Sequence, residues 1–227
     1  MIGRGDTGVD PLRERSLLVF VLVTLVIAFP AMVAVWHLGH LPMHMAMNRY
    51  HSPGMDVAFP YITELANGWV PVIVALVLLR KSWRAFLMIG LAAVISGILT
   101  QILKQLAFPQ VVRPSMLFQS MPGLHTVPGL EFHHYMSFPS GHSTTAFAMC
   151  IALAVVFARP WVTAVLAAVA SVLAYSRVYL SQHFTEDILA GALIGTLVGI
   201  GVYLLLYKGK WAQRVGLDRS PFVRQNQ

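Results

Sequence analysis

Two histidines and a carboxylate form the most specific chemical pattern in this sequence. His183 and Asp187 are four residues apart, so they share one face if that turn is helical, and they can still meet if the helix begins between them. A carboxylate bound to one imidazole nitrogen fixes the tautomer, so the other nitrogen is free to act as a nucleophile. His142 supplies a second imidazole, which is suited to protonate a leaving oxygen and then to take a proton from water. The pattern predicts nucleophilic catalysis with His183 as the attacking group.

Basic residues near the ends of apolar segments predict the charge of the substrate. Lys104, Arg113 and Arg177 would be costly at a membrane boundary without a partner, so their clustering implies an anionic ligand. Guanidinium groups bind phosphate oxygens in pairs. Ser140 and Gly141 precede a helix, where free backbone amides form an anion site and glycine lets the backbone approach the ligand. We expect a phosphoryl pocket without a metal ion, because the basic residues supply the charge that magnesium would provide.

The order of these residues resembles the signature of the type 2 phosphatidic acid phosphatase superfamily, which is related to glucose-6-phosphatase and to vanadium-dependent haloperoxidases. That signature is a lysine, six residues and Arg-Pro; then Pro-Ser-Gly-His; then Ser-Arg, five residues, His, three residues and Asp. The second motif is complete at residues 139–142 and the third at residues 176–187. The first differs, because eight residues separate Lys104 from Arg113. The additional two residues must bulge if both charges are to face one phosphate.

The resemblance covers about Leu17–Tyr207 and implies a function. It implies that His183 forms a phosphohistidine supported by Asp187, and that His142 protonates the leaving group and then activates water. The implied enzyme is a lipid phosphatase that hydrolyses a phosphate monoester or diphosphate without a cofactor. Candidate substrates are phosphatidic acid, phosphatidylglycerol phosphate, polyprenyl phosphates and lipid A. A lipid phosphotransferase stays open as an alternative; a vanadium haloperoxidase is disfavoured by the apolar helices.

Composition indicates the elements that must position this chemistry. Of the 227 residues, 57% are hydrophobic and 11% are charged, whereas soluble domains carry about 25% charged residues. A soluble monomer and a disordered chain are therefore excluded. We predict one all-α integral membrane domain over residues 1–227, with a core at 17–207 and tails at 1–16 and 208–227. Its six transmembrane helices are expected at Leu17–Leu38, Tyr61–Leu79, Ala85–Leu106, Ser143–Ala158, Trp161–Leu180 and Thr185–Tyr207.

Basic residues also predict the orientation in the membrane. Twelve of the sixteen Lys and Arg residues lie in the tails and in the second–third and fourth–fifth loops, which are therefore expected to be cytoplasmic. We expect a multi-pass inner (plasma) membrane protein with both termini in the cytoplasm and the chemistry on the opposite face. The net charge of +7 is then an orientation signal, and it does not indicate a nucleic-acid partner. The expected partners are membrane lipids and the lipid phosphate substrate.

A long loop over residues 107–139 is predicted to contact the headgroup of the substrate. Loops of this length commonly form a lid or the rim of a binding site. The candidate contacts in this loop are His125, Glu131, His133 and His134. The spacing of these residues does not favour a zinc site.

Overall fold

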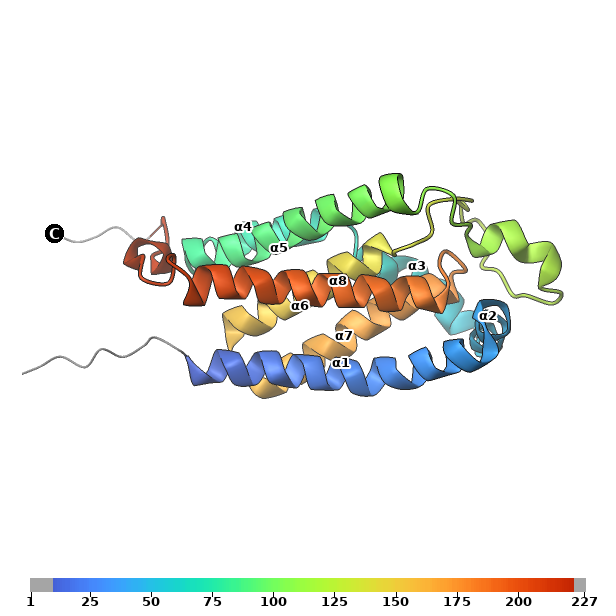
Figure 1. The fold of residues 1–227 in the computed structure, drawn as a ribbon, viewed down its shortest axis with the longest axis horizontal. Coiled ribbons are helices and arrows are strands. Elements are labelled where there is room, and N and C mark those ends of the chain that lie inside the picture. The colour runs from blue at the N-terminus through green and yellow to red at the C-terminus, as the bar shows by residue number, and fades with distance from the viewer. Residues whose placement is uncertain (1–9, 223–227) are drawn as a thin grey trace, which may run out of the picture.

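The computed structural model describes residues 10–222, and this range is helical without a β-strand, which confirms the all-α prediction. The helices run along an elongated bundle, and both described ends of the chain lie at the same end of it (Figure 1). The predicted tail residues Arg4 and Arg224 fall outside the described range. The α-helices are α1 (Pro11–Leu38), α2 (His40–Asn48), α3 (Pro53–Glu64), α4 (Trp69–Leu78), α5 (Trp83–Ile102), α6 (Gly141–Phe157), α7 (Pro160–Tyr179) and α8 (Thr185–Tyr203).

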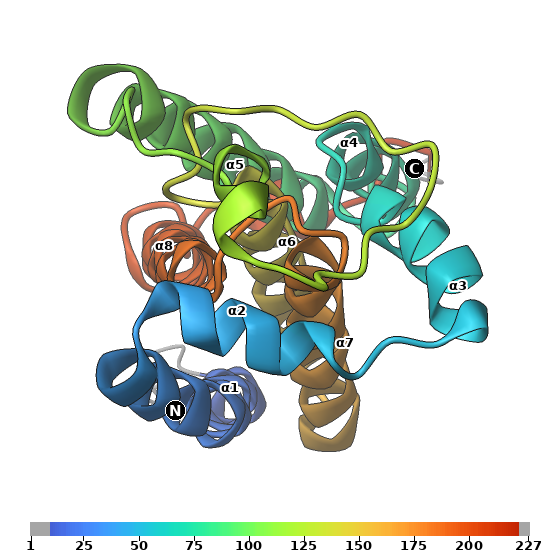
Figure 2. The same cartoon turned by 90° about the vertical axis from the view of Figure 1, so that its right-hand side faces the viewer.

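Four of these helices are long and apolar enough to cross a membrane individually, namely α1, α5, α7 and α8. The α5 and α8 spans include π-helical extensions at Leu103–Ala107 and Leu204–Lys208. The α3–α4 pair forms one further span bent by 59°. The apolar α6 is shorter, at 17 residues, and lies in the centre of the bundle (Figure 2). Four or five of the six predicted crossings are thus long and apolar enough to span a membrane, and α6 is the sixth apolar helix of this integral membrane protein.

The prediction of one continuous helix over Tyr61–Leu79 is wrong. α3 ends at Glu64, and a turn through Asn67 and Gly68 precedes α4. The side-chain amide of Asn67 donates to the Glu64 carboxylate at 3.1 Å, and both turn residues are weak helix formers. Pro71 lies in the first turn of α4, where its missing amide costs no helical hydrogen bond.

Small residues allow α8 to approach α6 closely. Gly191, Gly195 and Gly199 are spaced four residues apart and lie on the face of α8 that packs against α6. A Cβ at Gly191 would lie 2.6 Å from the carbonyl oxygen of Ser140, and one at Gly195 would lie 2.4 Å from that of Thr144. Real Cβ atoms do not approach other atoms that closely, so only glycine permits this packing. As a result, the first turns of α6 and α8 lie side by side.

Two further segments cover the end of the bundle where α6 and α8 begin. α2 crosses this end, and the chain between α5 and α6 loops over it through a short 3₁₀-helix at Pro114–Ser120 (Figure 2). The amide of Arg113 donates to the carbonyl of His134 at 2.8 Å, and the amide of Ser137 donates to that of Val111 at 3.0 Å. The two limbs of this loop are therefore joined before the chain enters α6.

Candidate active site

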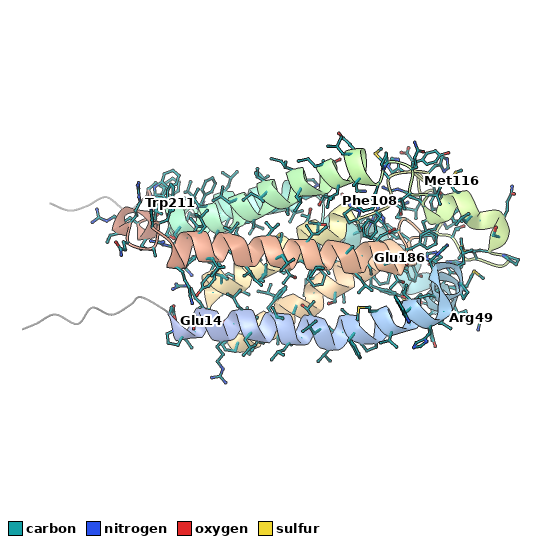
Figure 3. All side chains as sticks on the ribbon, in the orientation of Figure 1. Glu14, Arg49, Phe108, Met116, Glu186 and Trp211 are labelled. Carbon is teal, nitrogen blue, oxygen red and sulfur yellow. The ribbon has the colours of Figure 1, made fainter. Side chains whose placement is uncertain are left out.

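Chain segments far apart in the sequence meet where α6 and α8 begin. The backbone amide of Ser140 donates to the carbonyl of Asp187 at 3.0 Å, which ties the start of α6 to the first turn of α8. Arg113, in the loop between α5 and α6, donates through Nη1 to the carbonyl of Gln182 at 3.1 Å, just before α8. Figure 3 labels Glu186 at this end of the bundle. The three motifs found in the sequence therefore converge on one place.

His183 is held in one orientation by its neighbours. It lies in the short connection between α7 and α8 and is 2% exposed. Its Nδ1 lies 3.2 Å from Asp187 Oδ2 and 3.4 Å from Ser137 Oγ. The same carboxylate oxygen accepts hydrogen bonds from Ser137 Oγ at 2.5 Å and from the amide of Phe184 at 2.9 Å. The carboxylate that orients the imidazole is thus itself fixed.

The contact of His183 Nε2 with Arg113 determines which ring nitrogen carries the proton. Its Nε2 lies 3.4 Å from Arg113 Nη1, and a guanidinium can only donate. Nε2 is therefore assigned as the unprotonated nitrogen, and Nδ1 carries the proton toward Asp187. Burial, followed by the charges of Arg113 and Arg177, lowers the pKa of His183 well below its usual value. The neutral ring with a free Nε2 is the form that a nucleophile requires.

The three predicted phosphate-binding cations are buried with neutral partners. Lys104 Nζ donates to the carbonyl of Met136 at 2.7 Å, and Arg177 Nη1 donates to the hydroxyl of Thr63 at 2.9 Å. Burial lowers the pKa of Arg113, against the opposing effect of Asp187. Lys104, Arg113 and Arg177 are only 7% to 8% exposed, and none forms an ion pair within residues 10–222. Buried cations without counter-ions favour an anionic ligand.

A π-helical turn follows α5 at the place where the first motif has additional residues. The turn covers Leu103–Ala107 and contains Lys104. A π-turn holds more residues than an α-helical turn, which supplies the predicted bulge. Lys104 and Arg113 then line one cavity of about 480 Å³, together with Gln101, Phe132, His133, His134, Tyr135 and Met136. The structure thus brings the two cations to a common opening despite their longer separation.

Ser140, Gly141 and His142 lie at the start of α6 and have different roles there. Ser140 caps the helix, because its Oγ accepts the amide of Ser143 at 3.4 Å. Its own amide is bound to Asp187, so that amide is not available to a phosphate. Gly141 and His142 follow as the first two helical residues, whose amides helix geometry leaves unpaired. The ring of His142 is close enough to Arg177 and His183 to interact with both electrostatically.

The four loop residues predicted to touch the headgroup divide into two groups. His133 and His134 line the cavity beside Lys104. Glu131 is not among the residues that line the cavity, and its backbone carbonyl accepts a hydrogen bond from Gln182 Nε2 at 2.9 Å. His125 instead bonds the Asp56 carboxylate at 2.9 Å on α3 and is not among the residues that line the cavity. The structure therefore places His125 as a tether between the loop and α3.

Three supporting residues were missed by the sequence patterns. Ser137 bridges Asp187 and His183, and Thr63 holds Arg177. His44 on α2 is fully buried, and its Nε2 lies 3.1 Å from Ser181 Oγ, two residues before His183. Burial lowers the pKa of His44 to about 4. These contacts join residues far apart in the chain, so no local spacing could reveal them.

The arrangement can bind an anion and attack it with an imidazole. Between residues 10 and 222, no three His, Cys, Asp or Glu side chains are grouped as a metal site would require. Cys150, the single cysteine of the sequence, is buried in the core of α6. What surrounds His183 is a set of cations and hydrogen-bond donors, which suits a phosphoryl group.

Comparison with known proteins identifies the family. The sequence profile of the PAP2 superfamily matches residues 82–211, which is more than half of the chain. The chain belongs to the PAP2 superfamily. The matched range includes all three motifs and the helices α5 to α8 that carry them. The family predicted from the motifs is confirmed, and the chain is a membrane phosphatase of the PAP2 type.

Individual relatives agree with this membership. A lipid A 4′-phosphatase of Porphyromonas gingivalis is 27% identical over 177 residues, which is 74% of this chain and 74% of that protein. The crystal structure of Aquifex aeolicus LpxE is 27% identical, with a TM-score of 0.63 over 72% of this chain and 93% of that chain. A transmembrane PAP2-type phosphatidylglycerolphosphate phosphatase from Bacillus subtilis shares the fold, with 23% identity and a TM-score of 0.55 over 84% of this chain and 93% of that one.

Proposed function

We propose that this PAP2 protein hydrolyses a phosphate monoester on a membrane lipid through a phosphohistidine at His183. The observation that supports the proposal is the free Nε2 of His183, which faces Arg113 among buried cations that form no ion pair within the described residues. A phosphate in this place would neutralise the cations and would put its phosphorus within reach of the nucleophile. Since electrostatic stabilisation dominates phosphoryl transfer, the cations would act where negative charge spreads in the transition state.

The proposed reaction has two steps. His183 Nε2 attacks phosphorus while the P–O bond to the lipid breaks, and His142 gives its proton to the departing alkoxide. The imidazolium that forms is stabilised by Asp187 through the Nδ1 proton. In the second step, His142 takes a proton from water as the water oxygen attacks phosphorus, which releases phosphate and restores neutral His183. The basic residues and the Gly141 amide bind the phosphate oxygens in both steps.

A saccharide lipid phosphate of the lipid A type is the substrate that we favour. Two relatives described above support it: one is named a lipid A 4′-phosphatase and the other is LpxE. The cavity beside Lys104 and Arg113 offers about 480 Å³, more space than a phosphate needs. Its rim combines the aromatic side chains of Phe132 and Tyr135 with two histidines, and such groups stack on sugars and bind their hydroxyls. The acyl chains would stay in the bilayer.

A phosphate-release assay on purified protein tests this function. The substrates are lipid A, phosphatidic acid, phosphatidylglycerol phosphate and a polyprenyl diphosphate, each assayed with a chelator present. We expect the highest kcat/KM with lipid A, with no requirement for added metal and with activity abolished in His183→Ala. Hydrolysis that survives His183→Ala or requires magnesium would contradict the mechanism. Labelled phosphate that appears on a second lipid instead of in water would identify a phosphotransferase.

We also propose that the active site faces away from the cytoplasm, in a single membrane domain with cytoplasmic tails. The support is the positive-inside bias of the sequence. Gln119 lies on the loop near the active site and Gln213 lies at the opposite end; both are exposed, while the native Cys150 is buried. In intact cells, a membrane-impermeant maleimide should label Gln119→Cys but not Gln213→Cys. Labelling with the reverse pattern would invert the proposed orientation.

A further inference from the structure

A second cavity with a basic lining lies at the end of the bundle opposite His183. It holds about 220 Å³ and opens between the first turns of α1 and α5 and the end of α8. Figure 3 labels Glu14 and Trp211 at this end, far along the bundle from Glu186. Its polar lining comes from six residues that are separate from the catalytic motifs: Arg13, Lys81, Ser82, Arg84, Tyr207 and Asp218.

One of its cations is already fully bound. Arg84 Nε donates to Asp218 Oδ1 at 2.6 Å, and Nη2 donates to Oδ2 at 3.0 Å. The guanidinium also donates to the backbone carbonyls of Leu206, Trp211 and Ala212. Arg84 is therefore saturated and serves as a wall of the cavity.

The other two cations retain unused binding capacity. Arg13 lies over the ring of Tyr207, at 4.7 Å from its centroid, and pairs with Asp10 at 2.7 Å through Nη1. Its Nε is buried and has no hydrogen-bond partner. Lys81 Nζ donates to the carbonyl of Val156 at 2.9 Å and forms no ion pair within the described part of the chain. A buried donor without an acceptor is costly, so it favours a ligand.

The Ser82 hydroxyl and the positive end of the α5 dipole also favour an anion in this cavity. Ser82 Oγ accepts the amide of Ala85 at 3.1 Å, which leaves the hydroxyl proton free to donate. Ser82 also caps α5, so the positive end of a 20-residue helix lies at the cavity. Partial burial, followed by the charges of Arg13 and Arg159, lowers the pKa of Lys81.

We propose that this cavity binds the phosphodiester headgroup of an anionic phospholipid such as phosphatidylglycerol. Three cations line or contact it, and two carboxylates, Asp10 and Asp218, oppose them, so the surplus is one positive charge. A phosphodiester carries one negative charge and matches that surplus. The ligand is assigned as a lipid because two exposed tryptophans lie at this end, as in the aromatic belts at membrane interfaces: Trp83, which follows the cavity residue Ser82, and Trp211 (Figure 3).

Lipid retention measured by native mass spectrometry tests the proposal. The full-length protein is purified in detergent with an equimolar mixture of phosphatidylglycerol and phosphatidylcholine, and the ratio of the two retained lipids is read directly. We expect a preference for phosphatidylglycerol that falls about fivefold in Lys81→Gln and in Arg13→Gln, since each cation near a lipid surface contributes about 1 kcal/mol. Arg80→Gln is the matched control: it removes an exposed charge that does not line the cavity.

Further arms distinguish this site from its alternatives. Arg113→Gln, in the catalytic pocket, should retain the preference; its loss there would place the lipid in the active site and overturn the proposal. An equal fall in Arg80→Gln would mean that surface charge alone is responsible and would also overturn it. In thermal unfolding, phosphatidylglycerol should raise the Tm of wild type more than that of Lys81→Gln. If inorganic phosphate produced the same rise, the site would be one for free anions and the lipid assignment would fail.

Discussion

Arg84 and Arg113 are buried at opposite ends of the bundle, and they differ in whether the protein supplies a carboxylate partner. Arg84, 4% exposed, is closed in by the Asp218 carboxylate and by backbone carbonyls from the segment after α8. Arg113, 8% exposed, donates to the carbonyls of Tyr135 and Gln182 and faces the bare Nε2 of His183. Arg84 therefore forms an ion pair within the protein, whereas Arg113 forms none within the described residues and is open to an anionic ligand.

This difference separates a structural charge from a functional one. A buried cation with a carboxylate partner and full hydrogen bonding stabilises the folded chain, and loss of one partner is destabilising. A buried cluster that lacks counter-ions opposes folding and is retained for ligand binding. The catalytic end should therefore respond to mutation in activity, and the opposite end should respond in stability.

The largest expected effect compares Arg113→Gln with Arg84→Gln. Arg113→Gln should lower kcat/KM about 100- to 1000-fold, as expected for loss of one donor to transition-state charge, while the Tm stays the same or rises. Arg84→Gln should lower the Tm by several degrees, because it leaves the Asp218 carboxylate and the carbonyls without their donor. Enzyme kinetics and thermal unfolding in detergent measure both. A larger loss of activity in Arg84→Gln than in Arg113→Gln would contradict the distinction.

The second largest effect is expected from Gly191→Ala, which disturbs the close packing of α6 against α8. Gly191→Ala places a Cβ 2.6 Å from the carbonyl of Ser140, so the two helices must separate near His142 and His183. We expect about a hundredfold loss in kcat/KM, because small displacements of catalytic groups are costly, together with a lower Tm. Gly201→Ala is the matched control in the same helix, since nothing lies within 4 Å of its Cβ. Equal behaviour of the two variants would remove the argument that close approach aligns the site.

A smaller effect is expected at Ser137, which binds both Asp187 and His183. Ser137→Ala should reduce kcat about tenfold with little change in KM, because the carboxylate is less well fixed while the cations still bind phosphate. Ser120→Ala, an exposed serine of the same loop, serves as the control. A change confined to KM would show that Ser137 contacts substrate instead of positioning the nucleophile.

The smallest effect on activity is expected for His44, which instead contributes to the pH dependence of stability. Burial lowers the pKa of His44 from 6.5 to about 4, so the unfolded chain binds more protons between these values. Stability should therefore fall as the pH drops from about 6.5 to about 4, with His44 contributing on the order of 3 kcal/mol over that window. His183 acts in the same direction. In His44→Gln, the fall in Tm with decreasing pH should be smaller; an unchanged slope would exclude this role.

Local sequence predicted most of the long helices and the segments that carry the motif residues. Long apolar segments have few other stable structures in a membrane, and the fourth predicted span, Ser143–Ala158, agrees with α6 to within two residues at its start. The motif spacing correctly predicted that His183 meets Asp187, although His183 precedes α8 and the carboxylate reaches back to it from the first turn of that helix. The roles assigned to these residues remain predictions until they are measured.

Long-range contacts were beyond the sequence patterns. Apolar composition did not reveal the break at Asn67, because hydropathy does not register a polar turn inside an apolar segment. His125 was grouped with His133 by position in the loop, yet the loop folds back and binds it to Asp56. The contact of His44 with Ser181 spans 137 residues. Each of these depends on how segments pack, which no local spacing encodes.

Direct detection of the phosphohistidine is the most decisive measurement. His142→Ala is mixed with an aryl phosphate, whose leaving group needs no proton, so phosphorylation proceeds while hydrolysis, which needs the base, is slow. After an alkaline quench, which preserves phosphohistidine, peptide mass mapping should locate the phosphoryl group on His183, and the His142→Ala, His183→Ala double variant should carry none. A phosphoryl group on another residue, or turnover with oxygen transferred directly from water without an intermediate, would contradict the proposed mechanism.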